Sequence, residues 1–180
     1  MTPMTTTNYG SKWAATKDLS RVEIAKLIRA DIKAAVKAGL LPKARYSVTC
    51  ESYSGGGSID VSISAVEGIP VHNAERLLFV HENPHEFERM SRYSAEMTKA
   101  IETIERIHGA YNYDGSDIQT DYFHVRYYGN VQVAWQYADA VAAEELAKAL
   151  EARDMPRPRL MLVPAQVANH CDFLAHIGAV

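Results

Sequence analysis

The chain has 180 residues, of which 47% are hydrophobic, and its formal net charge is −3. This length and composition fit one domain with a hydrophobic core rather than two domains. The slight negative charge argues against a protein whose affinity comes from neutralising many phosphates, and it is too small for a mimic of DNA. Two cysteines cannot supply a disulfide framework. No apolar run is as long as the about 18 residues that a membrane-spanning helix needs. We therefore expect a soluble protein of a reducing cytosol.

Three parts are expected along the chain: a flexible N-terminal arm over residues 1–12, an α+β domain over 13–155, and a C-terminal strand with a short helical tail over 156–180. Within the domain, Ser20 and Glu23 have the spacing of a capping box. Apolar residues then recur at helical spacing until a glycine and a proline follow, which predicts the first helix.

The glycine-rich stretch YSGGGSIDV lies between two segments, 45–51 and 58–64, in which polar and apolar residues alternate. Glycines can cradle a phosphate, but such loops usually have a helix N-terminus directly behind them, and here a strand pattern follows. The stretch therefore predicts the turn of a β-hairpin. A functional loop tip is the alternative, with Tyr53 and Asp60 as its contact groups.

The second half of the chain has a similar pattern. Residues 77–80 suggest a strand, and Pro84 suits the first turn of a helix that runs to His108. A second hairpin is predicted next, turning at Gly129 and Asn130, with inward residues Phe123, Val125, Tyr127, Val131, Val133 and Trp135. A helix over residues 138–153 and a short apolar strand, LMLV, complete the order.

Two helix-plus-hairpin units in series predict the fold class. We expect an α+β fold in which the two units form an antiparallel sheet with the helices packed on one face. The halves are similar in pattern rather than in residues, so they are not read as a sequence repeat.

Two runs of the sequence resemble a known family. The run from KWAATKDLSRVEIAKLIRADIKAAV through YSVTCESYSGGGSIDVSIS, and the later run AYNYDGSDIQTDYFHVRYYGNV, are similar to large polyvalent protein associated domain 29, a family found in proteins of phages, plasmids and conjugative elements. The similarity is most specific at YSGGGSIDV and SDIQTDYF. The family often continues with a tryptophan and a DGPT-like turn where this chain reads SISAVEGIP. The resemblance implies an accessory role in a mobile element and supplies no catalytic residues.

The segment HENPH, residues 81–85, spells the HExxH pattern of zinc hydrolases. On a helix, His81 and His85 would hold Zn²⁺ while Glu82 acted as general base. Proline at position 84 opposes that geometry, because a helix that begins there leaves the two histidines on different faces. A zincin-like hydrolase, with a third ligand from Glu102, Glu105 or His108, is therefore kept only as an alternative to a chance match.

Two further clusters contain residue types that bind metals. Asp114, Asp117 and Asp121 lie in DGSDIQTD, but the order and the glutamate of an EF-hand are missing, so an acidic turn is the simpler interpretation. Near the C-terminus, His170, Cys171, Asp172 and His176 match no closed zinc site. We expect no metal and no cofactor.

The outward residues of the second hairpin form a candidate binding surface. They are Tyr122, His124, Arg126 and Tyr128. Aromatic rings interleaved with a cation can stack on bases, and the same enrichment marks protein interfaces. Packing against a helix is the alternative without any partner. Together with Tyr53, Asp60, Asp117 and Asp121, these residues complete the predicted binding set.

From these features we expect a non-enzymatic α+β accessory protein of a phage or plasmid. It would act in the bacterial host cytosol by binding a host protein or complex, and inhibition of a defence system such as CRISPR is the first form to test. The near-neutral charge favours a protein partner over single-stranded nucleic acid. The sequence does not fix the oligomeric state, and a dimer stays among the alternatives.

Overall fold

The computed structural model describes residues 8–116 and 124–154. Its elements, in chain order, are β1 (Asn8–Tyr9), α1 (Trp13–Thr16), α2 (Arg21–Lys37), β2 (Arg45–Tyr53), β3 (Gly56–Ser64), α3 (Ala74–Glu82), α4 (Ala95–Gly109), β4 (Tyr113–Asp114), β5 (Val131–Val133) and α5 (Trp135–Asp154). Among these residues β2, β3 and β5 form one sheet, and β1 pairs with β4 in another. The α+β class is confirmed.

Local signals set the first half of the domain. The Ser20 hydroxyl accepts a hydrogen bond from the Glu23 backbone N–H, and the Glu23 carboxylate accepts one from the Ser20 backbone N–H. The predicted capping box therefore begins α2. Gly39, with φ +73°, follows the end of that helix. β2 and β3 then pair in antiparallel register over nine residue pairs, from Arg45 with Ser64 to Tyr53 with Gly56. The first predicted helix and hairpin are therefore confirmed.

The hairpin turn needs only one of its three glycines for a positive φ. Gly55 has φ +91°, whereas Gly56 and Gly57 belong to β3. Gly57 serves a different purpose, because a β-carbon there would lie 2.5 Å from the Glu51 carbonyl oxygen. The glycine run therefore turns the chain and lets the two strands approach each other, and no helix follows it.

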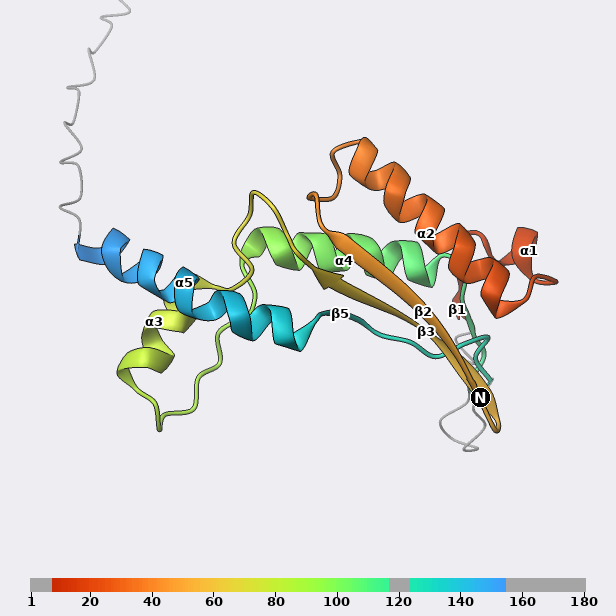
Figure 1. Cartoon of the computed structure of the whole chain (residues 1–180). Coiled ribbons are helices and arrows are strands. Elements are labelled where there is room, and N and C mark those ends of the chain that lie inside the picture. The colour runs from red at the N-terminus through yellow and green to blue at the C-terminus, as the bar shows by residue number, and fades with distance from the viewer. Residues whose placement is uncertain (1–7, 117–123, 155–180) are drawn as a thin grey trace, which may run out of the picture.

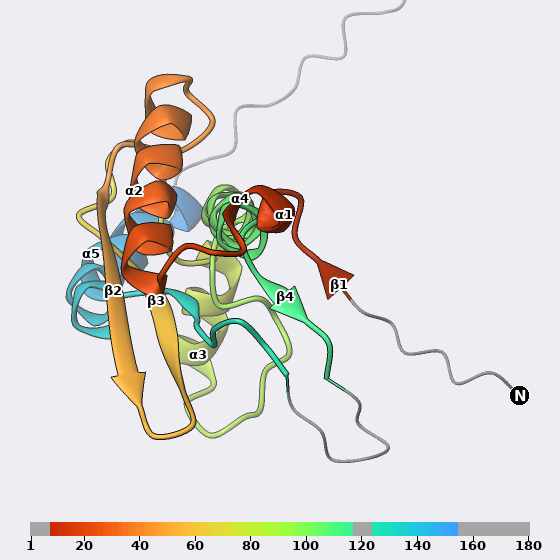
Figure 2. The same ribbon diagram turned by 90° about the vertical axis from the view of Figure 1, so that its right-hand side faces the viewer.

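Helices α2 and α4 lie side by side over one face of the sheet, with α2 over β2 and α4 over β5 (Figure 1). Figure 2 views α4 nearly end-on, next to α2. The buried layer between helices and sheet consists of Ile24, Ile28 and Ile32 from α2, Met97 and Ile104 from α4, and Ile59, Val61 and Ile63 from β3. Burying such side chains contributes about 1.5–3 kcal/mol each.

The predicted second hairpin is wrong. β5 runs parallel to β3, with Val61 opposite Val131 and Ile63 opposite Val133, so the sheet is mixed rather than antiparallel. The chain reaches β5 by way of α3 and α4, and such a crossover places a strand parallel to the one it left. Trp135, expected to point inward, begins α5 and is 66% exposed.

Two other predicted elements also differ from the structure. Residues 77–80 are not a strand but part of α3, which begins after Asn73, whose side chain accepts from the backbone of Glu75 and Arg76. No helix begins at Pro84: α4 starts after its cap Ser94, and Phe87 is 86% exposed. Asn73 and Ser94 each cap the start of a helix, and the apolar pattern that follows them did not reveal either start.

Part of the expected N-terminal arm is also structured. Asn8 and Tyr9 pair with β4, and Lys12 forms an ion pair with Asp31 of α2. Backbone pairing with β4 holds residues 8 and 9 in place. The sequence around these residues does not indicate that pairing, because β4 lies about a hundred residues further along the chain. The predicted tail over residues 156–180 lies outside the described residues. No described helix is long and apolar enough to cross a membrane.

Candidate binding surface

The sheet residues that point away from α2 and α4 are mainly polar, and in Figure 1 no described helix runs along that side of β2 and β3. Because strand side chains alternate, the residues that point away from the core on β2, β3 and the segment beside β3 share this face. We call them the open face: Arg45, Ser47, Thr49, Glu51, Tyr53, Ser58, Asp60, Ser62, Ser64, Tyr128, Asn130 and Gln132. Those on β2 and on residues 128–132 are exposed.

Two of the predicted binding residues meet at one end of the open face. Tyr53 pairs with Gly56 across the hairpin, and Tyr128 bridges to Ser58 in parallel register. A β-carbon on Gly56 would lie 3.4 Å from Cε2 of Tyr53 and 3.6 Å from Cε2 of Tyr128. The rings thus flank a position without a side chain, and they are 50% and 45% exposed.

Asp60, also predicted as a contact group, fixes the local structure of this surface. Its carboxylate accepts from the Ser58 hydroxyl at 2.7 Å and from the Asn130 backbone N–H at 3.1 Å. The second bond ties the segment that carries Tyr128 to β3. Asp60 therefore positions the open face and contributes one negative charge to it.

Arg126 does not belong to a free binding face, contrary to prediction. Its guanidinium donates to the carbonyl oxygens of Thr16, Tyr111 and Leu19, and to the Thr16 hydroxyl at 3.1 Å. Burial lowers the pKa of Arg126 from its usual value. The side chain fastens the end of α1 to the segment before β5, because a guanidinium can satisfy several carbonyl groups at once.

His124 lies in a separate cluster. Its Nδ1 is 3.1 Å from the Tyr113 hydroxyl, and the Tyr113 ring contacts Tyr9 and Trp13 at centroid distances of 4.9 and 5.6 Å. The structure therefore does not bring His124 to the two tyrosines of the open face. The remaining predicted binding residues, Asp117, Asp121 and Tyr122, lie outside the described residues.

The HExxH segment does not form a metal site in the described part of the chain. α3 ends at Glu82, so His81 belongs to the helix and His85 does not. The Glu82 carboxylate forms an ion pair with Arg153 of α5. Within residues 8–116 and 124–154, no three His, Cys, Asp or Glu side chains are grouped to hold a metal ion.

His108, considered as a third ligand, is a buried structural residue. Its Nε2 donates to the Ile59 carbonyl oxygen at 2.8 Å, and its ring meets Tyr127 edge-on at 5.0 Å. Desolvation lowers the pKa of His108, and the bond to Ile59 opposes this only in part. The Tyr127 hydroxyl donates to the His108 carbonyl oxygen at 2.5 Å, and burial raises the pKa of that hydroxyl.

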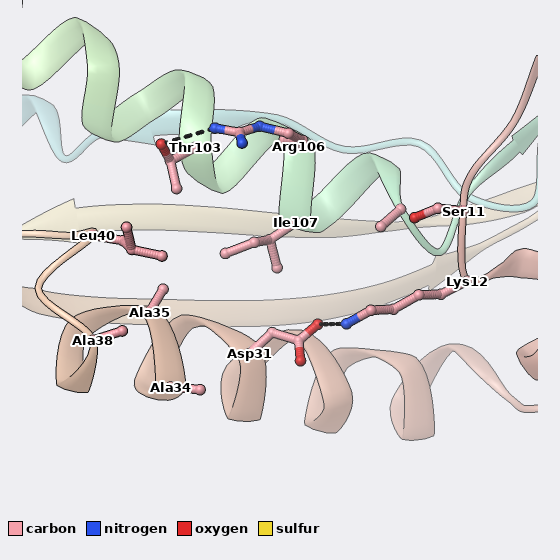
Figure 3. A pocket seen from close by; sticks show the side chains of 11 residues that line it. Ser11, Lys12, Asp31, Ala34, Ala35, Ala38, Leu40, Thr103, Arg106 and Ile107 are labelled. Carbon is pink, nitrogen blue, oxygen red and sulfur yellow. Dashed lines mark hydrogen bonds and ion pairs between the residues drawn. The ribbon is translucent and has the colours of Figure 1, made fainter.

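A hollow lies on the other side of the molecule, between α2 and α4. It has a volume of about 430 Å³ and an apolar lining that includes Ala34, Ala38 and Ile107 (Figure 3). Its charged groups are engaged nearby: Lys12 pairs with Asp31, and Arg106 donates to Thr103 at 3.2 Å. The hydrogen bond that Lys12 donates to the Asp31 carboxylate raises the pKa of Lys12. This hollow is chiefly a gap between two helices with small side chains.

Comparison with known proteins gives no relative: no family model, no curated protein and no solved structure matches the chain. The resemblance to the polyvalent-protein associated family therefore stays a prediction based on the two runs named above. The candidate surface has to be judged from its own geometry.

Proposed function

We propose that this chain is a non-enzymatic binding protein that recognises another protein through its open face, with Tyr53 and Tyr128 at the centre of contact. The observation that carries this proposal is the convergence of the two half-exposed rings beside Gly56, from positions far apart in the sequence. Exposed tyrosines on a rigid support are typical anchors of protein interfaces, because they bury a large area for little loss of conformational entropy.

The support for these rings is well ordered by its own hydrogen bonds. The two-residue turn holds Tyr53 at the end of β2, and the Tyr128 N–H donates to the Gly57 carbonyl oxygen at 3.0 Å, while the Ile59 N–H donates to the Tyr128 carbonyl oxygen at 2.8 Å. A partner would therefore meet a preorganised surface. Preorganisation favours affinity because less order has to be imposed on binding.

The charges of the open face favour a protein over a nucleic acid. Arg45 is its only cation, and Glu51 and Asp60 are anions, so the face has no excess of positive charge to neutralise phosphates. Stacking of bases on the two tyrosines is the competing use. It would have to overcome the repulsion between phosphates and Asp60.

The proposed setting is a phage or plasmid, with a host protein or complex of the bacterial cytosol as the partner. This part rests on the sequence resemblance alone. Within that setting, interference with a bacterial defence system such as CRISPR is the specific activity to test first.

Affinity capture from a bacterial lysate, followed by mass spectrometry, tests the proposal. The wild-type chain is compared with Tyr53→Ala/Tyr128→Ala and with Phe87→Ala, which removes an aromatic ring that is 86% exposed outside the open face. Each interface tyrosine can contribute about 2 kcal/mol, or roughly a thirtyfold change in affinity. A protein retained by the wild type and Phe87→Ala but lost by the double variant would support the proposal.

A parallel titration with a single-stranded oligonucleotide separates the two uses of the face. If oligonucleotide binding needs both tyrosines and weakens steeply with salt, the partner of the open face is a nucleic acid rather than a protein. Identical captured proteins for the wild type and both variants would rule out the open face as the binding site.

A further inference from the structure

The outer edge of β2 lacks a neighbouring strand in the part of the chain that the structure describes, since the sheet order is β2, β3, β5. The Val61 N–H donates to the Asn130 carbonyl oxygen, on the β5 side of β3. Val48, opposite Val61, must then direct its own backbone groups away from β3. By the same alternation, Tyr46, Val48, Cys50 and Ser52 present N–H and C=O groups along the outer edge.

This edge has little of the protection that exposed edges usually carry. β2 is nine residues long, its register with β3 is continuous, and it contains neither proline nor lysine. Native proteins normally protect such an edge with these residues or with a bulge. Here the guanidinium of Arg29, from α2, donates to the Val48 carbonyl oxygen and covers one of the outward groups.

A groove runs beside the same edge, on the helix side of the sheet. It has a volume of about 310 Å³, and its apolar lining consists of Ile32, Val36, Ala44, Tyr46 and Val48. Arg29 and Lys33 also line it. Asp31, Ala34 and Ala38 of α2 line the hollow toward α4, so the groove occupies the other flank of that helix. A strand added to β2 would direct alternate side chains into this groove.

We propose that the β2 edge binds an extended, acidic and apolar segment of another protein as an added strand. Main-chain hydrogen bonds to the outward groups of β2 would give affinity, and alternate side chains would give specificity. An apolar side chain fits the floor of the groove, and a neighbouring carboxylate fits Arg29 and Lys33. Neither cation forms an ion pair with any residue that the structure describes.

A second copy of this chain fits the edge less well. Antiparallel pairing of two β2 edges about Val48 would bring two Arg29 side chains together near the two-fold axis. Like charges at close range oppose such pairing. The edge is also distinct from the open face, so a segment bound here does not depend on Tyr53 and Tyr128.

The test uses a synthetic peptide, TVTETVTET, in which valine and glutamate share one face of the extended chain. Its control is TVTKTVTKT, with the opposite charge. Amide hydrogen exchange of the full-length protein is followed by NMR. Bound peptide should protect the outward amides of Tyr46, Val48, Cys50 and Ser52, while those of Ser47 and Thr49, which already face β3, should change little.

Charge reversal supplies the matched comparison. Arg29→Glu/Lys33→Glu should weaken binding of TVTETVTET about tenfold and shift the preference to TVTKTVTKT. Lys26→Glu/Lys37→Glu changes the net charge equally on exposed positions of α2 that do not line the groove, and it should leave binding near the wild-type level. Circular dichroism checks that both double variants keep their helices.

Three results would overturn the proposal. One is the absence of new protection at the outward amides with peptide in the millimolar range. Another is equal loss of affinity in the two double variants, which would show a general charge effect. The third is protection of these amides before any peptide is added. If sedimentation then shows a dimer, a second copy of the chain occupies the edge. If it shows a monomer, another part of the chain occupies it.

Discussion

Gly55 and Gly129 each lie between two segments with alternating polar and apolar residues, but they have different roles in the fold. Gly55 has φ +91°, and a β-carbon there would meet nothing within 4 Å. Gly129 has no positive φ, and a β-carbon there would lie 1.9 Å from the Ile59 carbonyl oxygen. The first glycine turns the chain, and the second lets one segment pass close to β3.

The comparison shows why similar patterns formed different structures. At Gly55 the two flanking strands pair with each other, and at Gly129 the flanking residues pair with β3 instead. Alternation indicates which side chains face the core, and it does not identify the neighbouring strand. Substitutions that affect one glycine or its surroundings can therefore separate the two roles.

The largest expected effect is that of Gly129→Ala. Its methyl group would overlap the Ile59 carbonyl oxygen and approach Nε2 of His108, which is 2.8 Å from the β-carbon position. We expect a loss of about 3 kcal/mol or more in the free energy of unfolding, because backbone atoms have to move apart. Urea denaturation measures this loss. Gly109→Ala, where a β-carbon meets nothing within 4 Å, is the control and should be nearly neutral.

Arg126→Met should have the next largest effect. The variant keeps an unbranched side chain but leaves the carbonyl groups of Thr16, Leu19 and Tyr111 without this donor. We expect a loss of about 2 kcal/mol, since partly buried acceptors that lose their donor are costly. Hydrogen exchange should show faster opening of residues 12–19 than in the wild type. If Arg126→Met instead left stability and exchange unchanged, the guanidinium would not fasten α1.

Gly55→Ala should cost less, about 1 kcal/mol, because only the unfavourable backbone conformation opposes the methyl group. Gly55→Asn should cost less than Gly55→Ala, since asparagine tolerates positive φ better. The same denaturation experiment ranks both against Gly129→Ala. A loss at Gly55 equal to that at Gly129 would contradict the distinction between a turn and a close approach.

The smallest expected effect is the pH dependence that His108 contributes. Burial lowers its pKa from the usual 6.5, so the unfolded chain binds a proton more readily than the folded one. The contribution of neutral His108 to stability is therefore complete above about pH 6.5, and it decreases as the pH drops from there toward the lowered pKa of the folded state. Thermal melting between pH 7.5 and 5, in about half-unit steps, should show a weaker dependence for His108→Gln, which keeps an N–H donor. Equal slopes for both proteins would place the titrating group elsewhere.

The candidate surface could be predicted only in part. The alternation in residues 58–64 placed Asp60 on the polar face of a hairpin strand, Tyr53 was named only as a contact group of the loop tip, and Tyr128 was correctly expected to point outward. Arg126 was misassigned because its place in the alternation says nothing about α1, whose carbonyl groups it satisfies. Gly129 was the one sequence signal that could have indicated close contact with another backbone, although a glycine in such a place equally suggests a turn.

The sequence by itself determined the elements whose signals are local. The capping box of Ser20 and Glu23 begins α2, and the period of two in residues 58–64 assigns Ile59, Val61 and Ile63 to the core. Only the tertiary structure decided that β5 pairs with β3, and that no described strand pairs with the outer edge of β2. The physical reason is that caps and periodicity act within a few residues, whereas the choice of a strand partner depends on packing between segments far apart in the chain.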